Sequence, residues 1–99
     1  MDKQDKLILL FDYYGDLLSD SQKNYFESYY FDNLSLSEIG ENYNVSRNAV
    51  SKDLKLASEK LNNYEEKLKI ISRDDKLRKL ASKIEDNDLK EKIMNILDE

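Results

Sequence analysis

The sequence contains no cysteine, no histidine, no proline and only two glycines among its 99 residues. Without cysteine it can form neither a disulfide nor a thiolate metal site, and without histidine it lacks the commonest metal ligand and general base. No aspartate or glutamate lies in an apolar segment that would raise its pKa for acid–base catalysis. We therefore predict a protein that is not an enzyme, with no catalytic residues, no metal site and no cofactor.

Long apolar segments are also missing. The chain opens with the polar residues Met1-Asp-Lys-Gln-Asp, which have neither the basic region nor the apolar run of a signal peptide. The longest uninterrupted apolar stretch is Leu7 to Phe11, far shorter than a membrane span. These features predict a cytoplasmic protein with no membrane insertion.

Charge is abundant but mixed, with 16 basic and 21 acidic residues and a net charge of −5. The acidic excess is spread over the whole chain instead of being gathered in a tail. No low-complexity linker separates one part from another. We expect a single domain over residues 1–99, with an N-terminal helix at 1–18, a helix-turn-helix core at 19–61 and a helical extension at 62–99.

Scarce glycine and absent proline favour helices with short connections, so an all-α fold of five to six helices is expected. Apolar residues at helical spacing predict a first helix over about residues 4–18. Two capping boxes, Ser19 to Gln22 and Ser35 to Glu38, predict the starts of the second and third helices. The second should end near residues 31–33, and Asn44 suits the left-handed end of the third.

The longest periodic pattern predicts a fourth helix, capped by Ser46 and unbroken to near Ile71. Its apolar residues alternate steps of four and three, which places them on one narrow seam: Val50, Leu54, Ala57, Leu61, Tyr64, Leu68 and Ile71. The seam could pack within the chain, or it could pair with a second copy to form a homodimer. Cap-like patterns at 72–75 and 86–88 predict a fifth and a sixth helix.

The third helix, a short turn and the fourth helix have the form of a helix-turn-helix. In DNA-binding proteins of this type the second helix enters the major groove with its N-terminal residues against the bases. Arginine and asparagine suit contacts with guanine and adenine, and serine and lysine suit phosphates. With Val50 and Leu54 facing the core, the candidate nucleic-acid-binding residues are Arg47, Asn48, Ser51, Lys52 and Lys55.

The tract from Leu18 to Leu61 resembles region 4 of bacterial sigma factors, a helix-turn-helix module that reads the −35 promoter element. The matching segments are residues 18–22, 30–40, 45–46 and 59–61. Where sigma modules usually carry arginines in the recognition helix, this chain has Asp53, Leu56 and Ser58. Arg47, Lys52, Lys55 and Lys60, set against Asp53 and Glu59, leave only a small local surplus of positive charge.

End to end, the chain is similar to the YlxM family. The resemblance rests on Leu7-Ile-Leu-Leu-Phe-Asp-Tyr-Tyr-Gly15, on the tract 18–61 and on the charged tail to Glu99. It implies a small bacterial protein, typically encoded beside the signal recognition particle GTPase or its receptor. The implied role is regulatory, in co-translational targeting, with the particle's GTPase or RNA as partner. The alternative is a transcriptional regulator that binds DNA through the recognition helix.

A further basic pattern lies in the tail. Its members fall at steps of four, three and seven, so that they could share a helical face: Lys69, Arg73, Lys76 and Lys83. This basic stripe is either a solvated face balanced by neighbouring acidic residues or a contact surface for RNA or an acidic protein.

Overall fold

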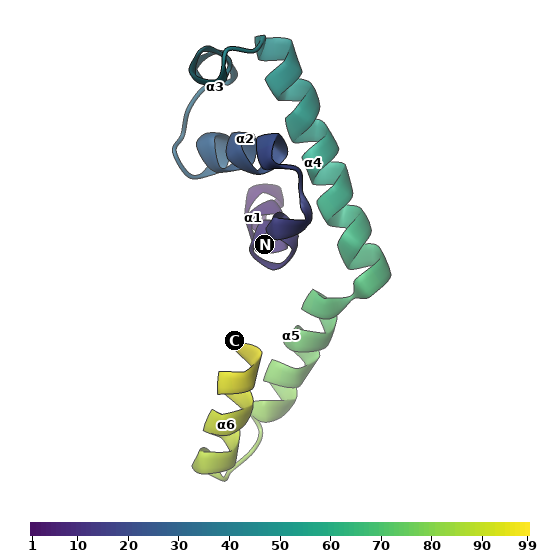
Figure 1. The fold of residues 1–99 in the computed structure, drawn as a ribbon. Helices are drawn as coiled ribbons and strands as arrows, with labels where there is room; N and C mark the ends of the chain where they lie inside the picture. The colour runs from purple at the N-terminus through teal and green to yellow at the C-terminus, as the bar shows by residue number, and fades with distance from the viewer. The chain divides into compact units, whose positions relative to one another are not determined.

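A computed structural model describes all 99 residues, and all of its regular elements are helical (Figure 1). In chain order these are α1 (Lys3–Tyr14), the short 3-10 helix η1 (Gly15–Leu17), α2 (Asp20–Tyr30), α3 (Leu36–Tyr43), α4 (Arg47–Leu68), α5 (Ile70–Ala81) and α6 (Asn87–Leu97). The predicted all-α fold is confirmed, and its six α-helices lie within the predicted five to six.

The chain divides into two compact units, residues 1–67 and 68–99, and each is described by itself. The tail was expected to begin at residue 62, but α4 continues through that position, so the second unit begins at Leu68. The single domain over residues 1–99 stays a prediction.

The N-termini of the first three helices are fixed by side-chain caps. Asp2 accepts a hydrogen bond from the amide of Asp5 and begins α1. Ser19 and Gln22 form the predicted capping box of α2, and Ser35 and Glu38 form that of α3. Each box satisfies two backbone amides that have no partner inside the helix, which sets where the helix begins.

The first helix is shorter than predicted. It ends at Tyr14 instead of Leu18, and Gly15–Leu17 form a 3-10 turn in which the amide of Leu18 donates to the carbonyl of Gly15. Leu17, expected on the inner face, is therefore exposed, while Leu18 is buried. The periodicity alone could not separate one α-helix from an α-helix that tightens at its last turn.

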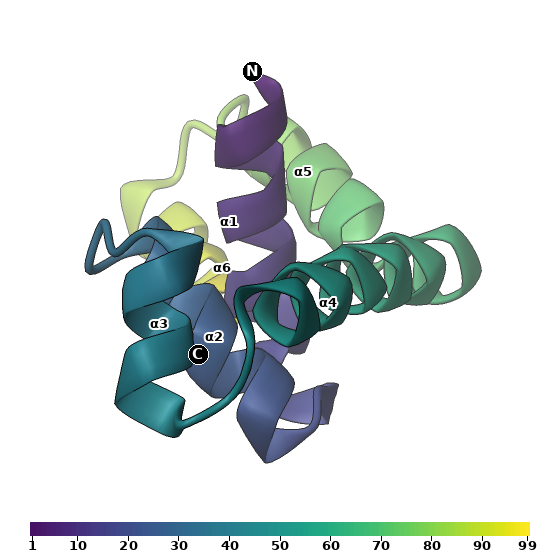
Figure 2. The same ribbon diagram turned by 90° about the horizontal axis from the view of Figure 1, so that it is seen from above.

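The core of the first unit lies where α1, α2, α3 and α4 meet, as the view from above shows (Figure 2). Its largest fully buried side chains are Phe26, Leu10, Ile39, Leu61 and Val50. The ring of Phe26 stacks on Phe11 of α1, with 4.3 Å between the ring centroids and 6° between the planes.

The hydroxyl of Tyr14 donates to Glu65 at 2.7 Å and ties α1 to α4. This contact joins two residues that are 51 positions apart in the sequence.

The fourth helix begins as predicted, because the side chain of Ser46 accepts from the amide of Ala49 at 3.0 Å. It also runs without a break through Asn62 and Asn63. It ends at Leu68 and not near Ile71, since Lys69 adopts a left-handed backbone with φ of 56°. Lysine adopts this conformation only at an energetic cost, so the sequence carries no signal for the break.

The predicted seam is correspondingly divided. Val50, Leu54, Ala57 and Leu61 are buried within the first unit, so packing inside the chain accounts for this half of the pattern. Leu68 is 53% exposed at the end of α4. Pairing with a second copy is not needed to cover the buried residues of the seam, and a homodimer stays a prediction.

The second unit is a hairpin of α5 and α6, which lie side by side and are joined by residues 82–86 (Figure 1). The start of α5 at Ile70 contradicts the predicted cap at residues 72–75, because the left-handed Lys69 begins the helix without a side-chain cap. Asp86 caps α6 as predicted and accepts from the amides of Asp88 and Leu89. None of the six helices is both long enough and apolar enough to cross a membrane.

Candidate nucleic-acid interface

The helix-turn-helix depends on a close approach of two backbones at Gly40. A methyl group at this position would lie 2.7 Å from the carbonyl oxygen of Val45, closer than two such atoms can come. The amide of Val45 in turn donates to the carbonyl of Gly40 at 2.9 Å, and Asn44 takes the predicted left-handed conformation with φ of 57°. The glycine thus lets the chain fold back tightly from α3 into α4.

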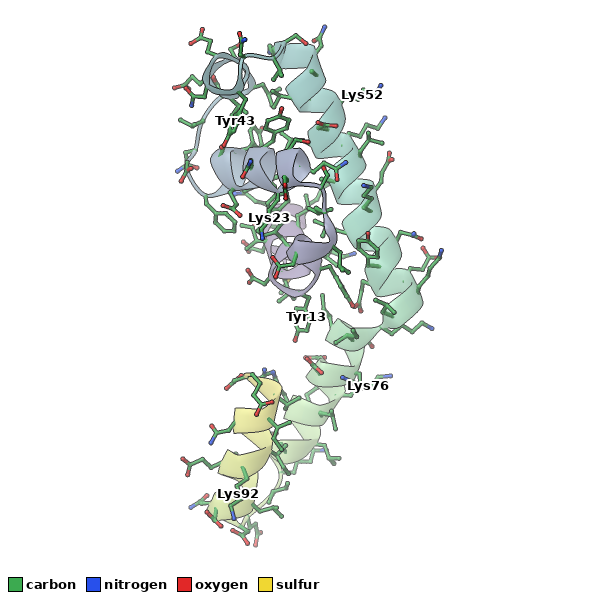
Figure 3. All side chains as sticks on the ribbon, in the orientation of Figure 1. Tyr13, Lys23, Tyr43, Lys52, Lys76 and Lys92 are labelled. Carbon is green, nitrogen blue, oxygen red and sulfur yellow. The ribbon has the colours of Figure 1, made fainter.

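The first turns of α4 form an exposed face, here called the recognition face, which comprises Arg47, Asn48, Ser51, Lys52 and Lys55. All five side chains are exposed, whereas Val50 and Leu54 on the opposite side are buried in the core. Figure 3 shows Lys52 directed away from the body of the first unit. The arrangement is that of a helix whose inner side anchors it and whose outer side is available. Binding of nucleic acid through these residues stays a prediction.

The cations of this face are available for a partner. Arg47, Lys52 and Lys55 form no ion pair within the chain, although Asp53 and Glu59 lie on the same helix.

Lys60 behaves differently. Its ammonium group donates to the side-chain oxygen of Gln22 at 3.1 Å, and that oxygen also accepts from the amide of Ser19 in the capping box of α2. Lys60 therefore supports the start of α2.

The basic stripe of the second unit is not continuous on one helix. Arg73 and Lys76 lie on α5, Lys69 precedes its first residue, and Lys83 follows its last. Arg73 lies 3.7 Å from the carboxylate of Asp74, whereas Lys69, Lys76 and Lys83 form no ion pair. The four residues are exposed, but the single helical face that their spacing suggested does not form, because α5 ends at Ala81. Their role as a contact surface stays a prediction.

A groove that the sequence analysis did not single out lies beside the recognition face. A cavity of about 350 Å³ is lined by Lys3, Lys6, Lys55, Tyr30, Ser58 and Asn62 and by the apolar Leu7 and Leu10. We call it the lysine groove. A second cavity of about 210 Å³ shares Tyr30, Lys55 and Ser58 with it and continues to Ser51. The groove is thus open to the recognition face at one end.

Spacing along α1 could have indicated one wall of this groove, since Lys3, Lys6, Leu7 and Leu10 follow helical periodicity. Which helix lies opposite could not be read from the sequence.

Two ionisable side chains near these features have shifted pKa values. Burial and the neighbouring Tyr29 raise the pKa of the Tyr30 phenol above its ordinary value. Hydrogen bonds from the backbone and the side chain of Ser35 lower the pKa of Glu38. Neither shift produces a general acid or base near neutral pH. Nowhere in the structure do three or more carboxylates gather in a way that could hold a metal ion.

The whole chain, residues 1–99, matches the family UPF0122, described as "Putative helix-turn-helix protein, YlxM / p13 like". The chain belongs to this family. A UPF0122 protein of Desulforamulus reducens is 54% identical over 68 residues, which are 69% of this chain and 58% of that relative. The match therefore spans little more than half of that relative's length.

Two further relatives extend the match. A UPF0122 protein of Malacoplasma penetrans is 40% identical over 90% of this chain and 83% of its own length. One of Listeria welshimeri is 42% identical over 85% of this chain and 76% of its own length. The predicted resemblance to YlxM is thus confirmed. The description of the family also names the helix-turn-helix that α3 and α4 form in the structure.

Proposed function

We propose that this protein is a non-enzymatic regulator that binds a nucleic-acid duplex through the recognition face of α4. The observation that supports this most directly is the exposure of Arg47, Lys52 and Lys55, without ion-pair partners, on a helix whose opposite side is anchored in the core. Phosphate contacts supply most of the affinity of such proteins, and one or two base contacts add preference. With three available cations and a net charge of −5, binding should be weak and its salt dependence shallow.

Within that role we propose the signal recognition particle, through its RNA or its GTPase, as the partner in the cytoplasm. Support comes from the resemblance to YlxM and from the missing arginines at Asp53, Leu56 and Ser58, which weaken the case for a promoter-reading module. The protein would alter the activity of the particle without performing chemistry, since it has no histidine or cysteine to perform it with. The basic stripe around Arg73 and Lys76 would serve as a second contact.

Transcriptional regulation is the second candidate, favoured by the exposed Arg47 and Asn48 at the start of α4. These side chains have the chemistry for guanine and adenine contacts in a major groove. If this candidate is correct, one DNA sequence should bind much more tightly than a random duplex at physiological salt.

The two candidates are separated by titrating the full chain into three targets: the particle's RNA, its GTPase during GTP hydrolysis, and a pool of DNA duplexes. Lys52→Gln should weaken binding to all duplexes alike and reduce the slope of log K against log salt by about 0.9. Arg47→Ala should instead reduce base preference. Lys67→Gln is the matched control, because Lys67 is an exposed cation of α4 outside the recognition face and has no ion pair.

Absence of any binding at micromolar concentrations would overturn the proposed duplex binding. A selective effect on the GTPase or on its RNA, with only weak and unselective DNA binding, would support the targeting role. Tight binding of one DNA sequence would support the transcriptional role instead.

A further inference from the structure

We infer that the lysine groove between α1 and α4 binds an unpaired nucleic-acid strand that continues from the duplex held at the recognition face. The continuation from a duplex rests on the function proposed above. The groove itself is argued from its own walls, which come from helices far apart in the sequence (Figure 2).

The charge of the groove is uniform in an otherwise acidic protein. Lys3, Lys6 and Lys55 line it, and neither cavity has an aspartate or glutamate among its lining residues. None of the three lysine ammonium groups forms an ion pair or a hydrogen bond within the chain. Three cations left without counterions along one groove favour a partner that carries repeated negative charge, as a phosphodiester backbone does.

The remaining wall fits the other parts of a nucleotide. Tyr30 lines both cavities, and Tyr29, which lines the second, is 38% exposed. Aromatic rings beside a basic groove are the usual platform for unpaired bases, because every base can stack on them. Ser58 and Asn62 already donate to backbone carbonyls of α4, which leaves their oxygens as acceptors for sugar hydroxyls.

The size of the groove decides between a strand and a duplex. A cavity of about 350 Å³ lies at the lower end of the range for small-ligand pockets, about 300–1,000 Å³, so it can take individual nucleotides but not a double helix. The second cavity leads on to Ser51 of the recognition face. A strand leaving a duplex at α4 could therefore enter the groove directly, passing Lys55 before it reaches Lys6 and Lys3.

The test compares blunt duplexes with the same duplexes carrying an unpaired six-nucleotide extension at either end, made in RNA and in DNA. Free single strands of the same sequence form a further arm, and binding to the full chain is measured by fluorescence anisotropy at several salt concentrations. The test variant is Lys3→Gln with Lys6→Gln, which leaves the recognition face intact. The control is Lys67→Gln with Lys90→Gln, which removes the same charge outside the groove.

We expect the extension to tighten binding several-fold. The Lys3/Lys6 variant should lose that gain, while its affinity for blunt duplexes stays within about twofold. Two lost single-strand phosphate contacts should reduce the salt slope by about 1.4, equivalent to about a sevenfold difference between 50 and 200 mM salt. The control variant should keep the gain. Comparing the RNA and DNA arms identifies which sugar the groove prefers.

An extension that adds nothing in any arm, while blunt duplexes bind, would overturn this inference and leave the proposed function intact. If blunt duplexes do not bind, the proposed function is overturned. Binding of the free single strands then tests the inference about the groove by itself. Single-strand binding that depends on Lys3 and Lys6 supports it, and single-strand binding that ignores them, or no binding at all, overturns it.

Discussion

The two units of the molecule use the same kind of element in different ways. In residues 1–67, four helices from distant parts of the sequence enclose a core of buried aliphatic and aromatic side chains. In residues 68–99, two neighbouring helices form a hairpin in which Ala81 is the one fully buried apolar residue, and α6 buries none. Since apolar burial is the main favourable term in folding, the first unit should hold most of the stability.

This difference can be followed with natural probes. The chain has no tryptophan, and its seven tyrosines all lie in residues 1–67. Tyrosine fluorescence therefore reports the first unit alone, while helical circular dichroism reports both. Coincident unfolding by the two signals would mean that the units fold together, and separated transitions would mean that they do not.

The largest expected effect comes from removing the centre of the first core. Phe26→Ala deletes a side chain that is 0% exposed and stacked on Phe11. We expect a loss of about 3–5 kcal/mol in unfolding free energy, seen as an earlier tyrosine transition in urea. Ile96→Ala in α6, where the side chain is 66% exposed, should change the free energy by no more than about 0.5 kcal/mol. Equal losses from the two variants would show that the contrast between the units is wrong.

A smaller effect is expected at the turn of the helix-turn-helix. Gly40→Ala would normally favour a helix by about 1 kcal/mol, but here the added methyl group meets the carbonyl of Val45 at 2.7 Å. Because backbone must move to relieve this contact, we expect a net loss of about 1–3 kcal/mol, measured in urea by tyrosine fluorescence. Glu41→Ala, at the next and exposed position of α3, is the control. If Gly40→Ala were stabilising, the turn would be looser than the structure indicates.

Most features of the first unit could be predicted from local signals in the sequence. Both capping boxes and the left-handed Asn44 act through hydrogen bonds between residues close in the chain, so residue type and spacing were sufficient to predict them. The helical seam likewise placed Val50 and Leu54 inward, which in turn exposed the recognition face.

The features that escaped prediction depend on tertiary contacts or on unfavourable backbone conformations. Lys69 ends α4 although nothing in its side chain favours φ of 56°. The lysine groove needs Lys3 and Lys55 to line one cavity from two helices separated by about half the sequence, and periodicity within one helix cannot show which partner helix it meets. The role of Lys60 in supporting α2 has the same origin, since it depends on a contact with Gln22.

The smallest expected effect concerns the link that holds the hairpin together. The guanidinium group of Arg78 on α5 donates to the carbonyl of Leu97 at 3.2 Å and to the carboxylate of Asp98 at 2.8 Å, both at the C-terminal end of α6. A cation at this end satisfies a carbonyl without a helical partner and interacts favourably with the helix dipole.

Arg78→Gln should therefore destabilise α6 selectively. Because the side chain is 37% exposed, solvent screening limits the loss to about 1 kcal/mol or less. Amide hydrogen exchange should accelerate across α6 and leave α2 unchanged, with no shift in the tyrosine transition. Lys79→Gln is the matched control, since its ion pair with Asp75 joins two exposed residues of α5 and does not reach α6. If exchange accelerated equally in α2, the two units would be coupled, and the hairpin could not be treated as a separately stable part of the molecule.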